Sequence, residues 1–172
     1  MGLDPNYIYG LFIGRDWVRK GLDIAIKSVM QSQKVKLIAV TDNYPAINNE
    51  KIILKNSIPS HELNNLYNCC DILLFPSKSE GLPTTVLEAM AVGLVPVLFE
   101  NIAENIPEIR NEYNAIVVRD EATFIKAVQS VENGSYAIEN MSSNAKSSIL
   151  RGYGCRGLTD LFDKIIKENI KK

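Results

Sequence analysis

Two glutamates, Glu80 and Glu88, stand at the two ends of a turn rich in glycine and proline. Between them, Gly81-Leu82-Pro83-Thr84-Thr85 combines a residue without a Cβ with a proline suited to a first helical turn. The glycine lets backbone approach a ligand, and the free N–H groups of the two threonines can bind phosphate. The carboxylates have no obvious charge partner, which suits hydrogen bonds from sugar hydroxyls. The segment predicts a site for a ligand that carries both phosphate and sugar.

A basic segment follows the first predicted strand. Gly14-Arg15-Asp16-Trp17-Val18-Arg19-Lys20-Gly21 places three cations within six residues. Gly14 permits a tight turn, Arg15 offers a bidentate fork to phosphate oxygens, and Lys20 adds a charge near a helix N-terminus. Exposed loops also carry such side chains for solubility, and the segment taken alone favours that simpler interpretation.

Glu88 also has an alternative role. Thr85-x-x-Glu88 has the spacing of a capping box, in which the two side chains satisfy backbone N–H groups at the start of a helix. The residue types therefore leave ligand binding and helix capping both open for Glu88.

Short apolar runs alternate with segments whose apolar residues recur every three or four positions, which is typical of parallel β-α-β units. The predicted strands are Tyr7–Ile13, Val35–Val40, Ile52–Leu54, Ile72–Phe75, Val95–Phe99 and Ala115–Val118. The predicted helices lie near Leu22–Met30, Leu63–Cys70, Thr84–Val92, Glu121–Val131, Ile138–Ile149 and Leu158–Ile170. We expect an α/β fold, a Rossmann-like, doubly wound, mainly parallel six-stranded sheet flanked by helices. Ligands of such sheets bind beyond the carboxyl ends of the strands, where both segments above lie.

The composition fits one globular domain of residues 1–172, with 46% hydrophobic and 23% charged residues. Nineteen Lys and Arg against twenty Asp and Glu give a net charge of −1, so no broad basic field favours nucleic acid. Cys69, Cys70 and Cys155 lack metal-ligand spacing, which predicts buried thiols and a cytoplasmic protein. The longest apolar run is well short of the ~20 residues that cross a bilayer.

The order of these motifs resembles the C-terminal, donor-binding half of retaining GT-B glycosyltransferases of family 4 (glycosyl transferases group 1). Glu80 and Glu88 fall on that family's E-x7-E motif, and the resemblance runs from about Ile8 to Val118. The matching residues are Gly14-Arg15, Lys20-Gly21, Tyr67, Asp71, Pro76-Ser77, Glu80-Gly81-Leu82-Pro83, Leu87-Glu88-Ala89-Met90-Ala91, Gly93, Pro96-Val97 and Ile106-Pro107-Glu108-Ile109.

The resemblance implies a catalytic set of Glu80, Arg15 and Lys20. The two cations would neutralise the donor diphosphate, and Glu80 would hold hydroxyls of the donor sugar beside an oxocarbenium-like transition state. Glu88 would hold the ribose hydroxyls. The remaining donor-binding residues are Gly14, Ile58, Gly81, Leu82, Thr84 and Thr85; Ile58 belongs to Ser57-Ile58-Pro59, where backbone would contact the base.

The same resemblance implies the reaction and the partners. The donor would be a UDP-, GDP- or ADP-sugar, transferred with retention to a carbohydrate or lipid-linked acceptor without a cofactor or metal; the chain has no Asp-x-Asp. An N-terminal acceptor domain would be absent from this chain, which alone would be inactive. The full protein would be cytoplasmic, with association at the inner membrane face left open. The alternatives are a non-catalytic nucleotide-sugar-binding or interaction module and a GT-B sugar-nucleotide epimerase.

Three departures from the family pattern point to an unusual donor preference. Thr41-Asp42-Asn43 replaces a glycine-rich turn, Ala103-Glu104-Asn105 replaces glycines before Pro107, and Ala115 replaces a glycine. A separate G-x-G-x-x-G match at residues 152–157 follows a helical segment and not a strand. We therefore interpret it as a loop before a last helix at about residues 158–170.

Overall fold

A single parallel sheet organises the chain in the computed structural model, which describes residues 2–42, 44, 47–56 and 58–153. Its strands are β1 (Ile8–Ile13), β2 (Val35–Val40), β3 (Ile52–Lys55), β4 (Ile72–Phe75), β5 (Val95–Phe99) and β6 (Ile116–Val118). They lie in the order β3-β2-β1-β4-β5-β6, and every pairing is parallel. The predicted α/β, doubly wound class is confirmed.

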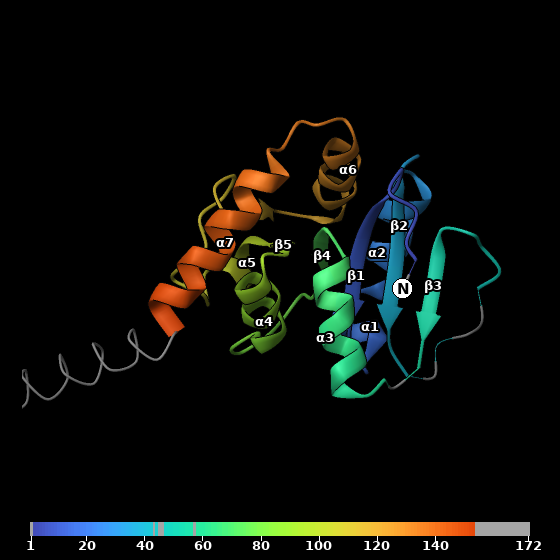
Figure 1. The fold of residues 1–172 in the computed structure, drawn as a ribbon, viewed down its shortest axis with the longest axis horizontal. Coiled ribbons are helices and arrows are strands. Elements are labelled where there is room, and N and C mark those ends of the chain that lie inside the picture. The colour runs from blue at the N-terminus through green and yellow to red at the C-terminus, as the bar shows by residue number, and fades with distance from the viewer. Residues whose placement is uncertain (1, 43, 45–46, 57, 154–172) are drawn as a thin grey trace, which may run out of the picture.

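Helices cover both faces of the sheet (Figure 1). They are α1 (Trp17–Lys20), α2 (Leu22–Met30), α3 (Ser60–Cys69), α4 (Thr84–Val92), α5 (Glu100–Ala103), α6 (Glu121–Glu132) and α7 (Ile138–Tyr153). α2 packs against α6, whereas α4 packs against α7 and α3. Every residue of β4 and β5 is buried, because helices shield the central strands from water on both sides.

The chain reverses its direction of winding between β1 and β4, which are neighbours in the sheet. From β1 it proceeds outward to β3, and from β4 it proceeds outward to β6 on the other side. The loops that follow β1 and β4 therefore leave the same edge of the sheet at this switch point, where ligands of open α/β sheets bind.

Gly21 brings these two loops together. It ends α1 and begins α2 with a φ of +75°, and a Cβ there would lie 2.5 Å from the carbonyl oxygen of Pro76, just after β4. A side chain would be strained by the backbone conformation and would also collide with the neighbouring loop. Glycine at this position lets α1 lie against the segment that carries Glu80.

Several local predictions differ from the structure. The short helices α1 and α5 were not expected, because four residues are too few to show a helical period. Gly152 and Tyr153 lie in the last turn of α7, so the expected loop there is wrong for these two positions. Cys70 is buried as predicted, but Cys69 is exposed. Cys155 and the helix predicted at residues 158–170 lie outside the described residues.

No helix in the described part of the chain is long and apolar enough to span a membrane.

Candidate functional site

Glu80 is the centre of a charged cluster at the switch point. Its Oε1 lies 2.7 Å from Nζ of Lys20 and 3.1 Å from Nη1 of Arg19, and it accepts a hydrogen bond of 2.6 Å from the hydroxyl of Ser77. The side chain of Glu80 is only 11% exposed. The expectation that Glu80 has no charge partner is wrong, because the partners come from a segment about sixty residues earlier in the chain.

The cluster keeps Glu80 ionised. Burial opposes its charged form, but hydrogen bonds from Lys20 and Ser77 and the charges of Lys20 and Arg19 outweigh this, so the pKa of Glu80 lies below its ordinary value. Asp16 also belongs to this cluster, since its Oδ2 lies 3.5 Å from Nε of Arg19, so two cations face two carboxylates. Both cations are therefore already paired with carboxylates, and Glu80 is in its ionised form.

The local backbone explains why Lys20 reaches Glu80. Asp16 caps α1 by accepting a hydrogen bond from the backbone N–H of Arg19 at 3.1 Å. Gly14 is not in a left-handed conformation. Its lack of a side chain serves a close contact instead, since a Cβ would lie 2.9 Å from Cγ of Lys20. Gly14 thus leaves room for the lysine stem.

Arg15 lies apart from this cluster. Its side chain is 89% exposed, and its closest charged partner in the described part of the chain is Asp42, with Nε 3.8 Å from Oδ2. Arg19 takes the position beside Glu80 and also donates to the carbonyl oxygen of Ser79 at 3.2 Å. Arg19 is one of the three cations of the basic segment, but the sequence alone assigned it no role. Residue spacing does not show which side chains of the four-residue helix α1 point toward Glu80.

In the first turn of α4, within the described part of the chain, the backbone N–H of Thr85 is free to bind a ligand, whereas that of Thr84 is not. α4 begins at Thr84 after Pro83, and no side chain caps it. The backbone N–H of Thr84 donates to the carbonyl oxygen of Leu82 at 2.9 Å, so it is already used. That of Thr85 has no partner among the described residues. Gly81 has open space where a Cβ would lie, and Leu82 is exposed, so the loop backbone is accessible.

Glu88 is held by a tyrosine and not by a capping box. The helix starts too early for Thr85 to be its cap, so the capping alternative for Glu88 is wrong. Glu88 is exposed, and its Oε2 accepts a hydrogen bond of 2.8 Å from the hydroxyl of Tyr67 on α3. Burial, followed by this bond and the charge of Glu88, raises the pKa of Tyr67, which therefore stays a donor at neutral pH.

Two asparagines, in α5 and just after it, hold the Glu80 loop through hydrogen bonds to its backbone. The side-chain amides of Asn101 and Asn105 donate to the carbonyl oxygens of Lys78 at 2.8 Å and Glu80 at 3.0 Å. Asn105 belongs to the segment that replaces the family's usual glycines. That departure therefore has a structural role, because the asparagine side chain fixes the loop.

A small cavity of about 160 Å³ adjoins Gly14 and Arg15 at the ends of β1 and β2. Ile58 lines it, as does Thr41, which is 2% exposed and whose hydroxyl has no hydrogen-bond partner among the described residues. An unpaired buried hydroxyl is uncommon and could pair with a ligand atom. The neighbouring Asn43 and Ser57 lie outside the described residues.

Solved structures share this fold. Sucrose-phosphate synthase from Thermosynechococcus elongatus matches with a TM-score of 0.80 over 98% of this chain and 47% of its own, at 15% identity. HepE from Anabaena, solved in complex with UDP-glucose, matches with a TM-score of 0.74 over 95% of this chain and 49% of its own, at 15% identity. The fold is that of the C-terminal half of GT-B glycosyltransferases.

The chain belongs to the family described as Glycosyl transferases group 1, whose model matches residues 8–133. One relative is the UDP-Gal:alpha-D-GlcNAc-diphosphoundecaprenol alpha-1,3-galactosyltransferase of Escherichia coli, 27% identical over 89% of this chain and 43% of the relative. The putative teichuronic acid biosynthesis glycosyltransferase TuaC of Bacillus subtilis is 29% identical over 59% of this chain and 27% of its own. The chain thus spans less than half the length of these relatives.

Proposed function

We propose that this chain is the donor-binding domain of a glycosyltransferase that uses a UDP-, GDP- or ADP-sugar. The single observation that carries the proposal is the charged cluster on Glu80, with Lys20 at 2.7 Å across the switch point of the sheet. Nucleotide phosphates need local cations, and sugar hydroxyls need carboxylates or other acceptors. The cluster supplies both, and Glu88 adds a further carboxylate on helix α4.

Lys20 and Arg19 would neutralise the donor diphosphate. Both already pair with Glu80, so the diphosphate would share cations that the carboxylate has oriented in advance. Arg19 is half exposed and can turn toward a ligand, whereas Lys20 is held between Glu80 and the ring of Phe75. As the glycosidic bond breaks, negative charge grows on the leaving diphosphate, and fixed cations stabilise it most at that point.

Glu80 would hold hydroxyls of the donor sugar through its remaining lone pairs, with its charge beside an oxocarbenium-like transition state. Glu88 would hold the ribose, and the Thr85 N–H would bind phosphate. We further propose retention, in which a donor phosphate oxygen accepts the acceptor's proton on the face that the leaving group occupies. That route requires neither a protein nucleophile nor a metal.

The main part of the acceptor site would lie elsewhere in a longer protein. The curated relatives are more than twice as long as this chain, which supports an additional N-terminal acceptor domain beside the single domain of residues 1–172. The chain would then bind a donor but transfer little alone. The acceptor would be a carbohydrate or lipid-linked carbohydrate, and the whole protein would act in the cytoplasm or at the inner membrane face.

Titration calorimetry with UDP, GDP, ADP and UDP-glucose tests the donor site. The wild-type chain should bind at least one of them, and Lys20→Ala should weaken that binding roughly 10- to 100-fold, the ~1.5–3 kcal/mol of a charge-assisted hydrogen bond. Lys78→Ala is the matched control, since this exposed lysine lies on the same loop and contributes only its backbone carbonyl. Absence of binding by every nucleotide at millimolar concentration would refute the proposal.

A further inference from the structure

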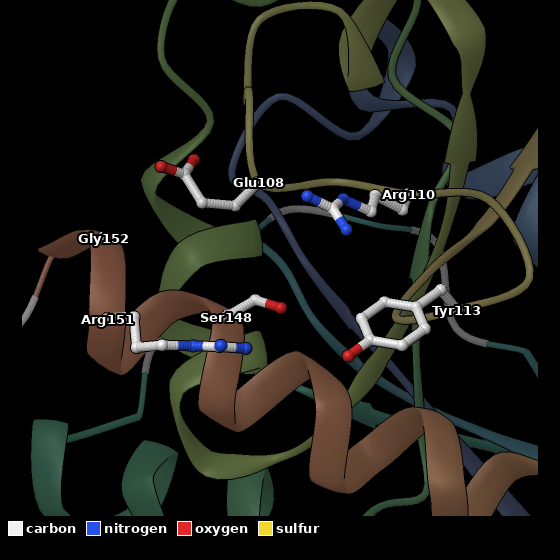
Figure 2. Close-up of a pocket in the computed structure, with 6 residues that line it drawn as sticks. All are labelled: Glu108, Arg110, Tyr113, Ser148, Arg151 and Gly152. Atoms are coloured by element: carbon white, nitrogen blue, oxygen red, sulfur yellow. The ribbon is translucent and has the colours of Figure 1, made fainter.

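A second basic pocket lies between the loop that follows α5 and the end of α7 (Figure 2). The cavity measures about 370 Å³ and is lined by Glu108, Arg110, Tyr113, Ser148, Arg151 and Gly152. It shares no residue with the donor site described above. Its lining contains two cations and one carboxylate, which favours an anionic ligand.

Four hydrogen-bond donors converge on this pocket. Figure 2 shows the guanidinium groups of Arg110 and Arg151 and the hydroxyls of Tyr113 and Ser148 directed toward one another. Neither arginine forms an ion pair within the described part of the chain. Nε of Arg151 donates to the carbonyl oxygen of Ser147 at 3.1 Å, which leaves its terminal nitrogens for a ligand.

The donors are held in place by a buried asparagine. The side-chain amide of Asn114 donates to the carbonyl oxygen of Glu108 at 2.8 Å and to Oγ of Ser148 at 3.0 Å, and its Oδ1 accepts from the N–H of Arg110 at 2.8 Å. Asn114 is fully buried, so this link between loop and helix is shielded from water. Ser148 is the acceptor in that bond and keeps its own proton for the pocket.

The carboxylate of Glu108 points away from the arginines, toward Gly152 (Figure 2). A Cβ on Gly152 would lie 2.7 Å from its Oε1, so the absence of a side chain there makes room for it. The other oxygen, Oε2, is buried and has no hydrogen-bond partner among the described residues. The pocket thus offers donors to a phosphate at one end and an acceptor to a hydroxyl at the other, a combination that a glycosyl phosphate satisfies.

The segment that carries Glu108 is joined to the Glu80 loop. Asn105 donates to the carbonyl oxygen of Glu80 at 3.0 Å, and Glu108 follows three residues later, a span of at most ~11 Å. We infer that the pocket binds a phosphoryl group of a phosphorylated acceptor, separately from the donor diphosphate. The inference rests on the proposed transferase function. The E. coli relative is named for an acceptor that carries a diphosphate.

Titration calorimetry with geranyl diphosphate, a short lipid-linked diphosphate, tests this pocket. With UDP present at saturation, wild type should bind it, and the double variant Arg110→Gln/Arg151→Gln should bind at least 10-fold more weakly. Lys146→Gln, an exposed cation on the same helix, should match wild type. The double variant should keep wild-type affinity for UDP.

The other outcomes separate the two proposals. If geranyl diphosphate binding is unchanged in the double variant, or falls equally in Lys146→Gln, the pocket assignment is wrong. If no nucleotide binds but geranyl diphosphate still depends on the two arginines, the phosphate pocket stands and the donor proposal fails. If the arginines govern binding to vesicles that contain phosphatidylglycerol while geranyl diphosphate does not bind, the ligand is a membrane headgroup and the acceptor assignment is overturned.

Discussion

Glu80 and Glu88 belong to one E-x7-E segment, yet their surroundings differ. Glu80 is largely buried and contacts two cations and a hydroxyl, all through the same oxygen. Glu88 is exposed and accepts a single hydrogen bond, from Tyr67. Glu80 therefore links two loops of the fold as well as facing the predicted ligand, whereas Glu88 contributes little to the fold. Substitutions at the two ends of the segment should separate stability from binding.

The largest expected effect is a loss of stability on substitution of Gly21, where the loops that follow β1 and β4 meet. Gly21→Ala should lower the free energy of unfolding by ~2–4 kcal/mol, because the left-handed conformation and the contact with Pro76 both oppose a Cβ. Gly134→Ala is the control, since Gly134 has a φ of +70° but open space around it, and should lose only ~1 kcal/mol. Urea unfolding of both variants measures the difference; equal losses would mean that the contact with Pro76 is unimportant.

Glu88→Ala should have the opposite profile. We expect nucleotide affinity to fall by roughly 10-fold or more, the ~1.5–3 kcal/mol of a hydrogen bond to a charged group, while the melting temperature changes little. Glu139→Ala, an exposed glutamate in the first turn of α7, is the control and should keep wild-type affinity. Calorimetry and thermal unfolding on the same samples give both readouts. A variant that melts lower but binds normally would remove Glu88 from the site.

Tyr67→Phe should produce a smaller change of the same kind. It removes the hydrogen bond that orients Glu88 but keeps the buried ring, so we expect affinity to fall about threefold to tenfold, or ~0.7–1.4 kcal/mol. In a Glu88→Ala background the same change should have no further effect, because its partner is already absent. Independent, additive losses in this double-mutant cycle would show that Tyr67 does not act through Glu88.

The smallest expected effect is the pH dependence of stability at Glu80. The fold lowers the pKa of Glu80, so the ionised carboxylate stabilises the protein at pH values above 4.5, the ordinary pKa of the group. This contribution disappears as the pH falls through the lowered pKa of the folded protein. Glu80→Gln should therefore be less stable than wild type at pH 7, by a margin that narrows toward pH 3. Urea unfolding across this range checks it, and a margin that widens on acidification would contradict the sign.

The sheet could be predicted because its information is local. Each central strand is a short apolar run, and burial on both faces requires such composition whatever the strand's neighbours are. The predicted strand boundaries agree with the structure to within one residue. The doubly wound class followed from the connectivity of parallel units, whereas the strand order required the structure. The charged partners of Glu80 could not be predicted, since spacing does not show how α1 is rotated.

The same distinction between local and distant information applies to the candidate site. Glu80, Glu88 and Lys20 could be proposed as site residues because they lie in the segments that follow β1 and β4. The preference for Arg19 over Arg15 beside Glu80, and the bond from Tyr67 to Glu88, depend on side-chain directions set by packing between distant segments. Asn105 could be marked as a departure from the family, but its hydrogen bond to the Glu80 loop required the structure.

The sequence by itself determined that this protein has a doubly wound parallel sheet, with residue types suited to phosphate and sugar in the segments at one edge. Periodicity, apolar runs and turn residues carry that information, because secondary structure and burial depend mainly on nearby residues. Only the tertiary structure decided which cation faces Glu80, that Glu88 is not a helix cap, and that Arg110 and Arg151 converge on one pocket. These features join residues far apart in the chain, and only the packing of helices on the sheet brings them together.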